Sequence, residues 1–260
     1  MRENASLEKI PAGAHPALTA HRGASFELPE NTIPALERAV EVGADFIEFD
    51  LRSTADDVPV LLHDPTVDRT ADGSGAVDRL SLAELRKLNF SCFRHGRRLD
   101  TPCFDRLEIP SFEEVLARFR GRVCMNIQVY ARGAALAEIC RLCRVWRMES
   151  CGYLTVTPAV AEEIRQIGSE MELCITPGWK ERSTPEMLRF CRDAGCRFVQ
   201  PVREFCTPET FRLCRELGLF SNVYFTDDPA EMERLAAAGA AGVMTNRIEQ
   251  LTSARERMLR

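Results

Sequence analysis

Short apolar runs alternate with segments of helical periodicity along almost the whole of this 260-residue chain. Eight of the runs have the length of buried strands, and the helical segments between them often begin at Thr or Asp followed by Pro and end at Gly. This alternation predicts βα units and a parallel sheet. The expected strands cover residues 17–21, 45–51, 122–129, 152–156, 171–176, 197–201, 219–225 and 241–245.

Eight such units in about 250 residues predict an α/β fold with a single TIM-type (β/α)8 barrel rather than an open sheet. No glycine-rich dinucleotide fingerprint follows the first strand, which argues against the open sheet. Residues 52–110 are too long for a plain crossover, so we expect an insertion between strands 2 and 3, where long ordered insertions usually serve a site. Without a linker or low-complexity tract, residues 1–260 are expected to form one domain.

Charge and hydropathy narrow the classes of partner. The net charge of −5 argues against a nucleic-acid binder, which normally presents a basic face, and favours a small-molecule partner. No run of about 18 apolar residues occurs, and the N-terminal stretch contains acidic residues, so we expect neither a transmembrane segment nor a signal peptide. The oligomeric state stays open.

The eleven cysteines are scattered through apolar runs, where reduced cysteine packs as a small hydrophobe. We therefore expect a reducing, cytoplasmic location. Cys140 and Cys143 form a C-x-x-C pair inside a helical segment without a second pair, and we interpret them as two helix positions one turn apart.

The active site of a barrel lies at the carboxyl ends of its strands, where polar residues close the apolar runs. The first run ends at His21 and Arg22, and the second contains Glu48 and Asp50, which point to the same side of a strand because they are two apart. Two buried like charges need something positive between them, and carboxylate ligands favour Mg²⁺ or Ca²⁺.

His63 and Asp64 follow an apolar run inside the insertion. Imidazoles exchange protons near neutral pH, so a second histidine beside the carboxylates suggests an acid–base pair with His21. The remaining histidines, His15 and His95, are interpreted as surface residues.

These motifs together resemble the glycerophosphodiester phosphodiesterase family. The order and spacing match over about the first 75 residues, and later landmarks extend the resemblance over nearly the whole chain. The matching segments are 21–23, 29–32, 43–50, 63–64, 68–70, Gly73, 109–116, Tyr224 with 228–229, and 239–245.

The resemblance implies that His21 and His63 are the acid–base pair, that Glu48 and Asp50 bind the metal, and that Arg22 contacts the phosphate. A cation and a bidentate guanidinium would stabilise the charge that develops on the phosphoryl oxygens. Which histidine is the acid stays open. Four neighbouring residues have structural interpretations: Glu30 and Asn31 as helix caps, and Arg69 with Asp72 as holding the turn of the insertion.

The third strand departs from the family pattern. Gln128 stands where the family has a glutamate ligand, and Tyr130 stands where it has a lysine that faces the phosphate. Gln128 still offers a neutral oxygen to a metal, and Tyr130 a neutral hydrogen bond to the substrate. Milder departures are Tyr224 in place of tryptophan, which can still form a wall of the alcohol pocket, and Asn246 in place of aspartate.

Three functions follow from this pattern. The first is metal-dependent hydrolysis of glycerophosphodiesters to glycerol 3-phosphate and an alcohol. The second is a catalytically impaired member that binds a phosphodiester or phosphate, which the two changes on the third strand favour. The third is a phosphodiesterase with an altered substrate, such as a lysophospholipid.

Overall fold

The computed structural model describes residues 5–10, 15–94 and 97–259 of the protein. Its centre is a parallel sheet whose strands have the order β8-β7-β6-β2-β1-β11-β10-β9. β8 and β9 lie close to each other and complete the ring, although no hydrogen-bonded ladder joins them in the described part of the chain. The expected eight strands and barrel are therefore confirmed. The strands are β1 (Ala17–Ala20), β2 (Phe46–Ser53), β6 (Cys124–Val129), β7 (Gly152–Val156), β8 (Glu172–Ile175), β9 (Phe198–Val199), β10 (Phe220–Val223) and β11 (Gly242–Thr245).

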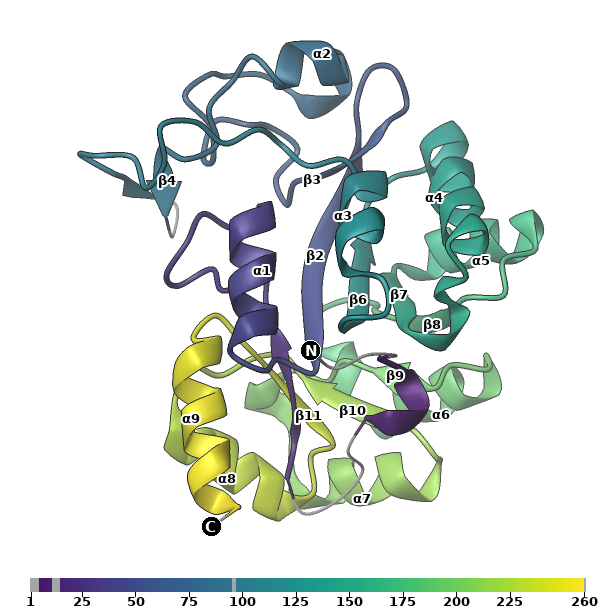
Figure 1. Cartoon of the computed structure of the whole chain (residues 1–260). Coiled ribbons are helices and arrows are strands. Elements are labelled where there is room, and N and C mark those ends of the chain that lie inside the picture. The colour runs from purple at the N-terminus through teal and green to yellow at the C-terminus, as the bar shows by residue number, and fades with distance from the viewer. Residues whose placement is uncertain (1–4, 11–14, 95–96, 260) are drawn as a thin grey trace.

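Helices follow the strands and pack around the ring (Figure 1). Thr and Asp residues cap several of them, and Pro stands in the first turn, as the sequence predicted. No helix among the described residues is both long and apolar enough to cross a bilayer. The helices are α1 (Ile33–Glu41), α3 (Phe112–Phe119), α4 (Gly133–Val145), α5 (Pro158–Ile167), α6 (Pro185–Asp193), α7 (Pro208–Glu216), α8 (Pro229–Ala238) and α9 (Ile248–Met258).

Two apolar cores lie on opposite faces of the strands. Ile47, Phe49 and Leu51 of β2 are fully buried against the helices. Phe46 points the other way and packs inside the ring with Tyr153 and Phe198. Because side chains alternate along a strand, the residues that continue the inward row of β2 are Glu48 and Asp50. Both carboxylates therefore face the interior of the barrel above its aromatic floor.

The insertion lies over one end of the barrel, with α2 (Leu82–Leu85) at the top of Figure 1 and β4 (Phe93–Arg94), which pairs antiparallel with β5 (Arg97–Arg98), at its upper left. Its first strand, β3 (Pro59–Leu61), pairs antiparallel with the last residues of β2. A small apolar core of its own, which includes Val67, Val77 and Phe90, holds it together. The antiparallel pairing with β2 returns the chain to the barrel mouth immediately before His63.

The structure also shows the surroundings of the cysteines and of the histidine outside the candidate site. All eleven cysteines are free and most are buried, and Cys140 and Cys143 lie in α4 as two buried helix positions. His15 is half-buried, so it presents part of its surface to solvent. His95 lies outside the described residues.

Candidate active site

Glu48 and Asp50 form the buried base of the site, with 4% and 1% of their surfaces exposed. One Glu48 oxygen accepts a hydrogen bond of 2.8 Å from the backbone N–H of Arg22. Burial, and next the neighbouring charge of Asp50, raises the pKa of the Glu48 carboxyl well above its ordinary value. Glu48 is thus under-compensated, and a bound cation would relieve its repulsion with Asp50.

The turn after β1 brings Arg22 onto this carboxylate pair. Its Nε lies 3.2 Å from Asp50 Oδ2, and one terminal nitrogen lies 2.8 Å from Glu30. Arg22 has a φ of +58°, an uncommon conformation for a residue with a side chain. The next residue must be glycine, because a Cβ on Gly23 would lie 2.6 Å from the backbone of Ala35 in α1.

Glu30 and Asn31 are parts of the site and not helix caps, which corrects the expectation for both residues. Thr32 is the cap of α1, since its side chain accepts the Ala35 N–H. The Asn31 amide donates to Asp50 Oδ2 at 2.9 Å, and its oxygen accepts the Asp50 N–H at 3.2 Å. Asn31 therefore fixes the orientation of the Asp50 carboxylate.

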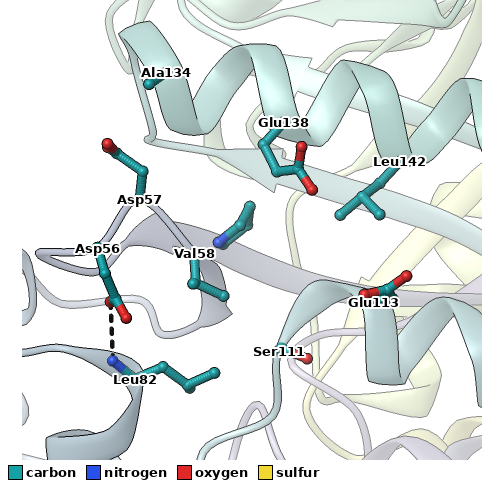
Figure 2. A pocket seen from close by; sticks show the side chains of 10 residues that line it. Asp56, Asp57, Val58, Leu82, Ser111, Glu113, Ala134, Glu138 and Leu142 are labelled. Carbon is teal, nitrogen blue, oxygen red and sulfur yellow. Dashed lines mark hydrogen bonds between the residues drawn. The ribbon is translucent and has the colours of Figure 1, made fainter.

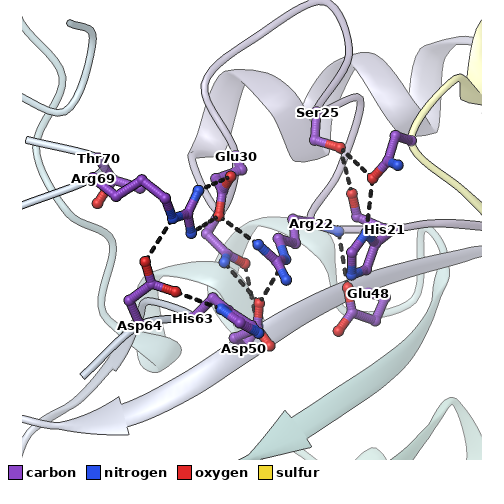
Figure 3. A network of polar contacts seen from close by, with 12 residues as sticks. His21, Arg22, Ser25, Glu30, Glu48, Asp50, His63, Asp64, Arg69 and Thr70 are labelled. Atoms are coloured by element: carbon purple, nitrogen blue, oxygen red, sulfur yellow. Dashed lines mark hydrogen bonds and ion pairs between the residues drawn. The ribbon is translucent and has the colours of Figure 1, made fainter. Parts of the chain in front are cut away.

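Glu30 joins the barrel to the insertion, as Figure 3 shows. It accepts hydrogen bonds from Arg22 on one side and from both terminal nitrogens of Arg69 on the other. Burial acts to raise the pKa of Glu30, but the hydrogen bonds and charges of Arg69 and Arg22 bring it down to about 2. Arg69 also bonds Asp64, five residues earlier, so it holds this turn of the insertion as expected and in addition joins it to Glu30. Asp72 holds the following segment, because it bonds to both backbone groups of Asn89.

His21 is held on the barrel side of the site. Its Nδ1 lies 2.8 Å from Asn246 Oδ1, and its ring contacts Tyr224 edge-on and Phe225 face-on. The amide nitrogen of Asn246 donates to Asp227 at 3.1 Å. Burial, and next the neighbouring charge of Arg22, lowers the pKa of His21 to about 4. His21 is consequently neutral near pH 7.

The chain Asp227–Asn246–His21 also fixes which ring nitrogen of His21 carries the proton. The Asp227 carboxylate accepts only, so it selects the NH₂ end of Asn246 and leaves the amide oxygen facing His21. That oxygen requires a proton on Nδ1, which leaves the lone pair of the neutral ring on Nε2. Neither Asn246 nor Asp227 was assigned this role from the sequence.

His63 lies on the insertion side, with 35% of its side chain exposed. Its Nδ1 lies 2.7 Å from Asp64, and its ring meets Tyr130 edge-on at 5.8 Å. Burial acts to raise the pKa of Asp64, but hydrogen bonds from Arg69 and His63 lower it to about 2. The Asp64 carboxylate stays charged and pairs with the histidine.

Gln128 and Tyr130 lie where the sequence placed them, at the end of β6 beside β2. Gln128 is the register partner of Asp50, and its amide nitrogen donates to the Thr155 carbonyl at 3.1 Å. The amide oxygen is thus the atom that Gln128 can offer to a cation. Tyr130 is 37% exposed and carries the Arg52 guanidinium over its ring, 4.4 Å from the centroid.

Tyr224 forms the opposite wall of the mouth. It contacts His21 on one side and Trp179 on the other, with centroids 5.2 Å apart in the second pair. Trp179 is half-exposed, and the Arg182 guanidinium lies 5.5 Å from its ring. Beside Tyr224 thus stand two residues that the sequence did not single out, because they follow β8 in a turn and a short 3-10 helix.

The donors expected for a cation are two carboxylates and an amide. Within residues 5–10, 15–94 and 97–259, no three His, Cys, Asp or Glu side chains are grouped to hold a metal ion. The cation site expected here needs only two such side chains, Glu48 and Asp50, since the amide of Gln128 would supply the third oxygen. The raised pKa of Glu48 fits this set, because it reflects a buried carboxylate in need of positive charge.

A separate cavity of about 490 Å³ lies where the insertion meets α3 and α4 (Figure 2). Its described lining residues include four carboxylates and no lysine or arginine. An anionic phosphodiester would be repelled there, so the barrel mouth is the better site for such a ligand. The four acidic residues are Asp56, Asp57, Glu113 and Glu138.

Comparisons with known proteins identify the family of the chain. Residues 21–250 match the sequence profile of the "Glycerophosphoryl diester phosphodiesterase family". Glycerophosphodiester phosphodiesterase 1 of Bos taurus is 44% identical over 107 residues, which are 41% of this chain and 30% of that protein. The match therefore spans less than a third of the length of that relative.

Solved structures show the same fold over nearly the full chain. A glycerophosphodiester phosphodiesterase from Agrobacterium tumefaciens str. C58 superposes with a TM-score of 0.79 at 24% identity, covering 93% of this chain and 99% of that one. A phosphodiesterase from Oleispira antarctica, in complex with its product sn-glycerol-3-phosphate, gives 0.78 at 18% identity, covering 93% and 97%. Because the family profile covers most of its residues, the chain belongs to the glycerophosphoryl diester phosphodiesterase family.

Proposed function

We propose that the protein hydrolyses glycerophosphodiesters to glycerol 3-phosphate and an alcohol, with His21 and His63 as the acid–base pair. The observation that carries the proposal is the different environment of the two histidines on either side of one buried carboxylate pair. The relative from Oleispira antarctica, which binds sn-glycerol-3-phosphate, supports the choice of product.

His21 is the general base in this proposal. Its neutral ring has a free Nε2, because Asn246 accepts the Nδ1 proton, and Nε2 takes the proton of the attacking oxygen. As the new P–O bond forms and the bond to the alcohol breaks, the imidazolium of His21 gains support from Asn246 and the nearby Asp50 and Glu30 charges.

His63 is the general acid. Its contact with Asp64 is an ion pair when the ring is protonated, and this is the form that a general acid needs. Nδ1 is engaged by the carboxylate, so Nε2 donates the proton to the departing alkoxide. The position of His63 at the half-exposed edge of the mouth also lets the alcohol leave towards solvent.

Glu48, Asp50 and Gln128 would hold a divalent cation, Mg²⁺ or Ca²⁺, as hard oxygen donors. When bound, the cation would polarise a phosphoryl oxygen and offset charge that develops there. Arg22 orients the phosphate from the side of β1, and Tyr224 packs against the alcohol or glycerol part of the substrate.

The proposal places the protein in the cytoplasm, where eleven free cysteines would remain reduced. No nucleic acid is expected as a partner, since the net charge is −5. The partner is a small phosphodiester.

A coupled assay tests the activity. Glycerophosphocholine, glycerophosphoethanolamine and lysophospholipids are incubated with Mg²⁺ or Ca²⁺, and both glycerol 3-phosphate and the released choline or ethanolamine are detected. We expect metal-dependent release of glycerol 3-phosphate from the glycerophosphodiesters. Binding of these compounds without turnover under any ion would indicate the catalytically impaired member. Release of choline or ethanolamine from lysophospholipids alone, with lysophosphatidic acid as the other product, would indicate the altered substrate.

A further inference from the structure

Arg52 lies at the junction of β2, the insertion and β6. Its Nε donates a hydrogen bond of 2.7 Å to the carbonyl of His63. Its guanidinium carbon lies 4.4 Å from the centre of the Tyr130 ring. Arg52 thus connects the proposed acid to the exposed tyrosine at the mouth, although no role in the site has been assigned to it.

Arg52 forms no direct ion pair with a protein carboxylate in the described part of the chain, and Asp50, Asp64 and Asp78 act on its charge only from a longer distance. Among the described residues, no Asp or Glu oxygen lies within 4.0 Å of its guanidinium, whereas Arg22 and Arg69 each contact two carboxylates. Arg52 is half-buried, so its charge is partly removed from water. A cation in such a place is costly unless an anion joins it, and a guanidinium suits a carboxylate through two parallel hydrogen bonds.

A cavity of about 280 Å³ opens beside this guanidinium. Arg52 and Tyr130 line it, and both contact His63, so it adjoins the proposed acid through these two side chains. The rim residue Arg132 already contacts Glu163, which leaves Arg52 as the cation available to a ligand. Its polar lining consists of Arg52, Ser53, Thr66, Asp78, Tyr130 and Arg132.

We infer that this cavity is the subsite of the leaving alcohol, and that it takes an alcohol bearing a carboxylate, of which serine is the matching head group. The inference rests on the proposed function, because His63 as the acid places the leaving alcohol on this side. Arg52 binds the carboxylate of the head group. Asp78, exposed in the same cavity, faces its ammonium.

The same arrangement disfavours choline. Quaternary ammonium ions are bound on the open faces of aromatic rings, and Arg52 already covers one face of Tyr130. Its positive charge also repels a cationic head group that lacks a carboxylate. Selectivity therefore follows from charge rather than from size.

Glycerophosphoserine and glycerophosphoethanolamine provide a matched test, because they differ only by the carboxylate. We expect the wild-type protein to turn over the serine compound with about tenfold or greater kcat/KM, the effect of one charge-assisted contact. Arg52→Gln should bring the ratio of the two kcat/KM values close to one, and Arg52→Lys should retain part of the preference. Arg141→Gln, at an exposed arginine of α4 that pairs with Glu138, is the control and should keep the wild-type ratio.

If Arg52→Gln left the ratio of the two kcat/KM values unchanged, the inference would be overturned. An equal loss of kcat/KM on both substrates is one such result, and it would mean that Arg52 only positions His63. A wild-type preference for the ethanolamine compound would also overturn it. The proposed function fails separately, if the wild type turns over neither compound. In that case the binding of both compounds is measured by calorimetry in EDTA. Tighter binding of the serine compound that is lost in Arg52→Gln supports the subsite, and equal binding of the two compounds overturns it.

Discussion

The two histidines of the site sit in opposite surroundings. His21 closes a barrel strand, is 8% exposed, and is enclosed by two aromatic rings and the Asp227–Asn246 chain. His63 stands on the insertion, is 35% exposed at its side chain, and has Asp64 as its hydrogen-bond partner. The barrel fixes His21 through residues that follow two of its strands. His63 is placed by the short antiparallel pairing of β3 with β2. A rigid and a more accessible proton carrier suit different steps of one reaction.

The largest expected effect comes from removing either ring. In the proposed mechanism, His21→Ala and His63→Ala should each lower kcat by about 10² to 10⁴, the usual contribution of acid–base assistance, with much smaller changes in substrate binding. The coupled assay and calorimetric binding measure the two quantities. Added imidazole should restore activity to His63→Ala better than to His21→Ala, because only the first ring leaves a space open to solvent. Wild-type activity in either variant would remove that histidine from the mechanism.

The next effect concerns Glu30, the link between the two sides. Its folded pKa of about 2 lies below the ordinary 4.5, so its ionisation stabilises the fold above about pH 4.5, and this contribution is lost as the pH falls towards 2. The size is about 3 kcal/mol at neutral pH. Glu30→Gln should lower the free energy of unfolding by up to this amount at pH 7.

Chemical denaturation at several pH values measures this difference. Glu48 titrates in the opposite sense, since its pKa is raised, and the Glu30 charge contributes to that rise, so both proteins are compared in a Glu48→Gln background. The gap between Glu48→Gln and Glu30→Gln/Glu48→Gln should therefore shrink as the pH falls from 5 towards 2. A gap that stays constant over this range would show that the Glu30 charge does not link Arg22 to Arg69.

A smaller effect is expected at Asp227, which acts on the His21 side alone. Asp227→Asn allows the Asn246 amide to turn over, so the fixed proton on His21 Nδ1 is no longer enforced. We expect kcat to fall about tenfold with KM nearly unchanged, as a lost hydrogen bond to a catalytic group implies. NMR of the His21 ring nitrogens should show a mixture of tautomers. If the NMR spectrum showed a single His21 tautomer while kcat was reduced, Asp227 would have another role.

The sequence predicts those features of the site that depend on residues close together in the chain, and it misses contacts between residues far apart. Alternation along one strand is local, so it placed Glu48 and Asp50 on the inward face. The contact of His21 with Asn246 joins residues 225 apart, and no periodicity reports it. Asn31 was misread for another reason: Glu30, Asn31 and Thr32 stand together before the helix, Asn and Thr both suit a cap, and only the structure shows that Thr32 takes this place.

The smallest expected effect concerns Gln128, on the strand between the two histidine sides. If its amide oxygen is a cation ligand, Gln128→Glu adds a third anionic oxygen at the same distance along the side chain and should tighten Mg²⁺ or Ca²⁺ binding about tenfold. The change also removes the hydrogen bond from the amide nitrogen to the Thr155 carbonyl, which sets a limit on the gain. Calorimetry measures the metal affinity, and thermal unfolding with and without metal provides a second reading by linkage.

Two controls make the Gln128 result specific. Tyr130→Lys alters the position that directly follows the same strand and should strengthen phosphate binding without raising metal affinity in the absence of substrate, because its positive charge acts on the same carboxylates as the cation. In Glu48→Ala/Asp50→Ala, the metal-dependent rise in Tm should vanish, because both anionic ligands are gone. Should Gln128→Glu leave metal affinity unchanged or weaken it while the double alanine variant still abolishes the metal response, the cation is held by the carboxylates of β2 without this glutamine. Gln128 would then act through Thr155 as a brace between β6 and β7, and the charge missing from the third strand would have to come from the substrate itself.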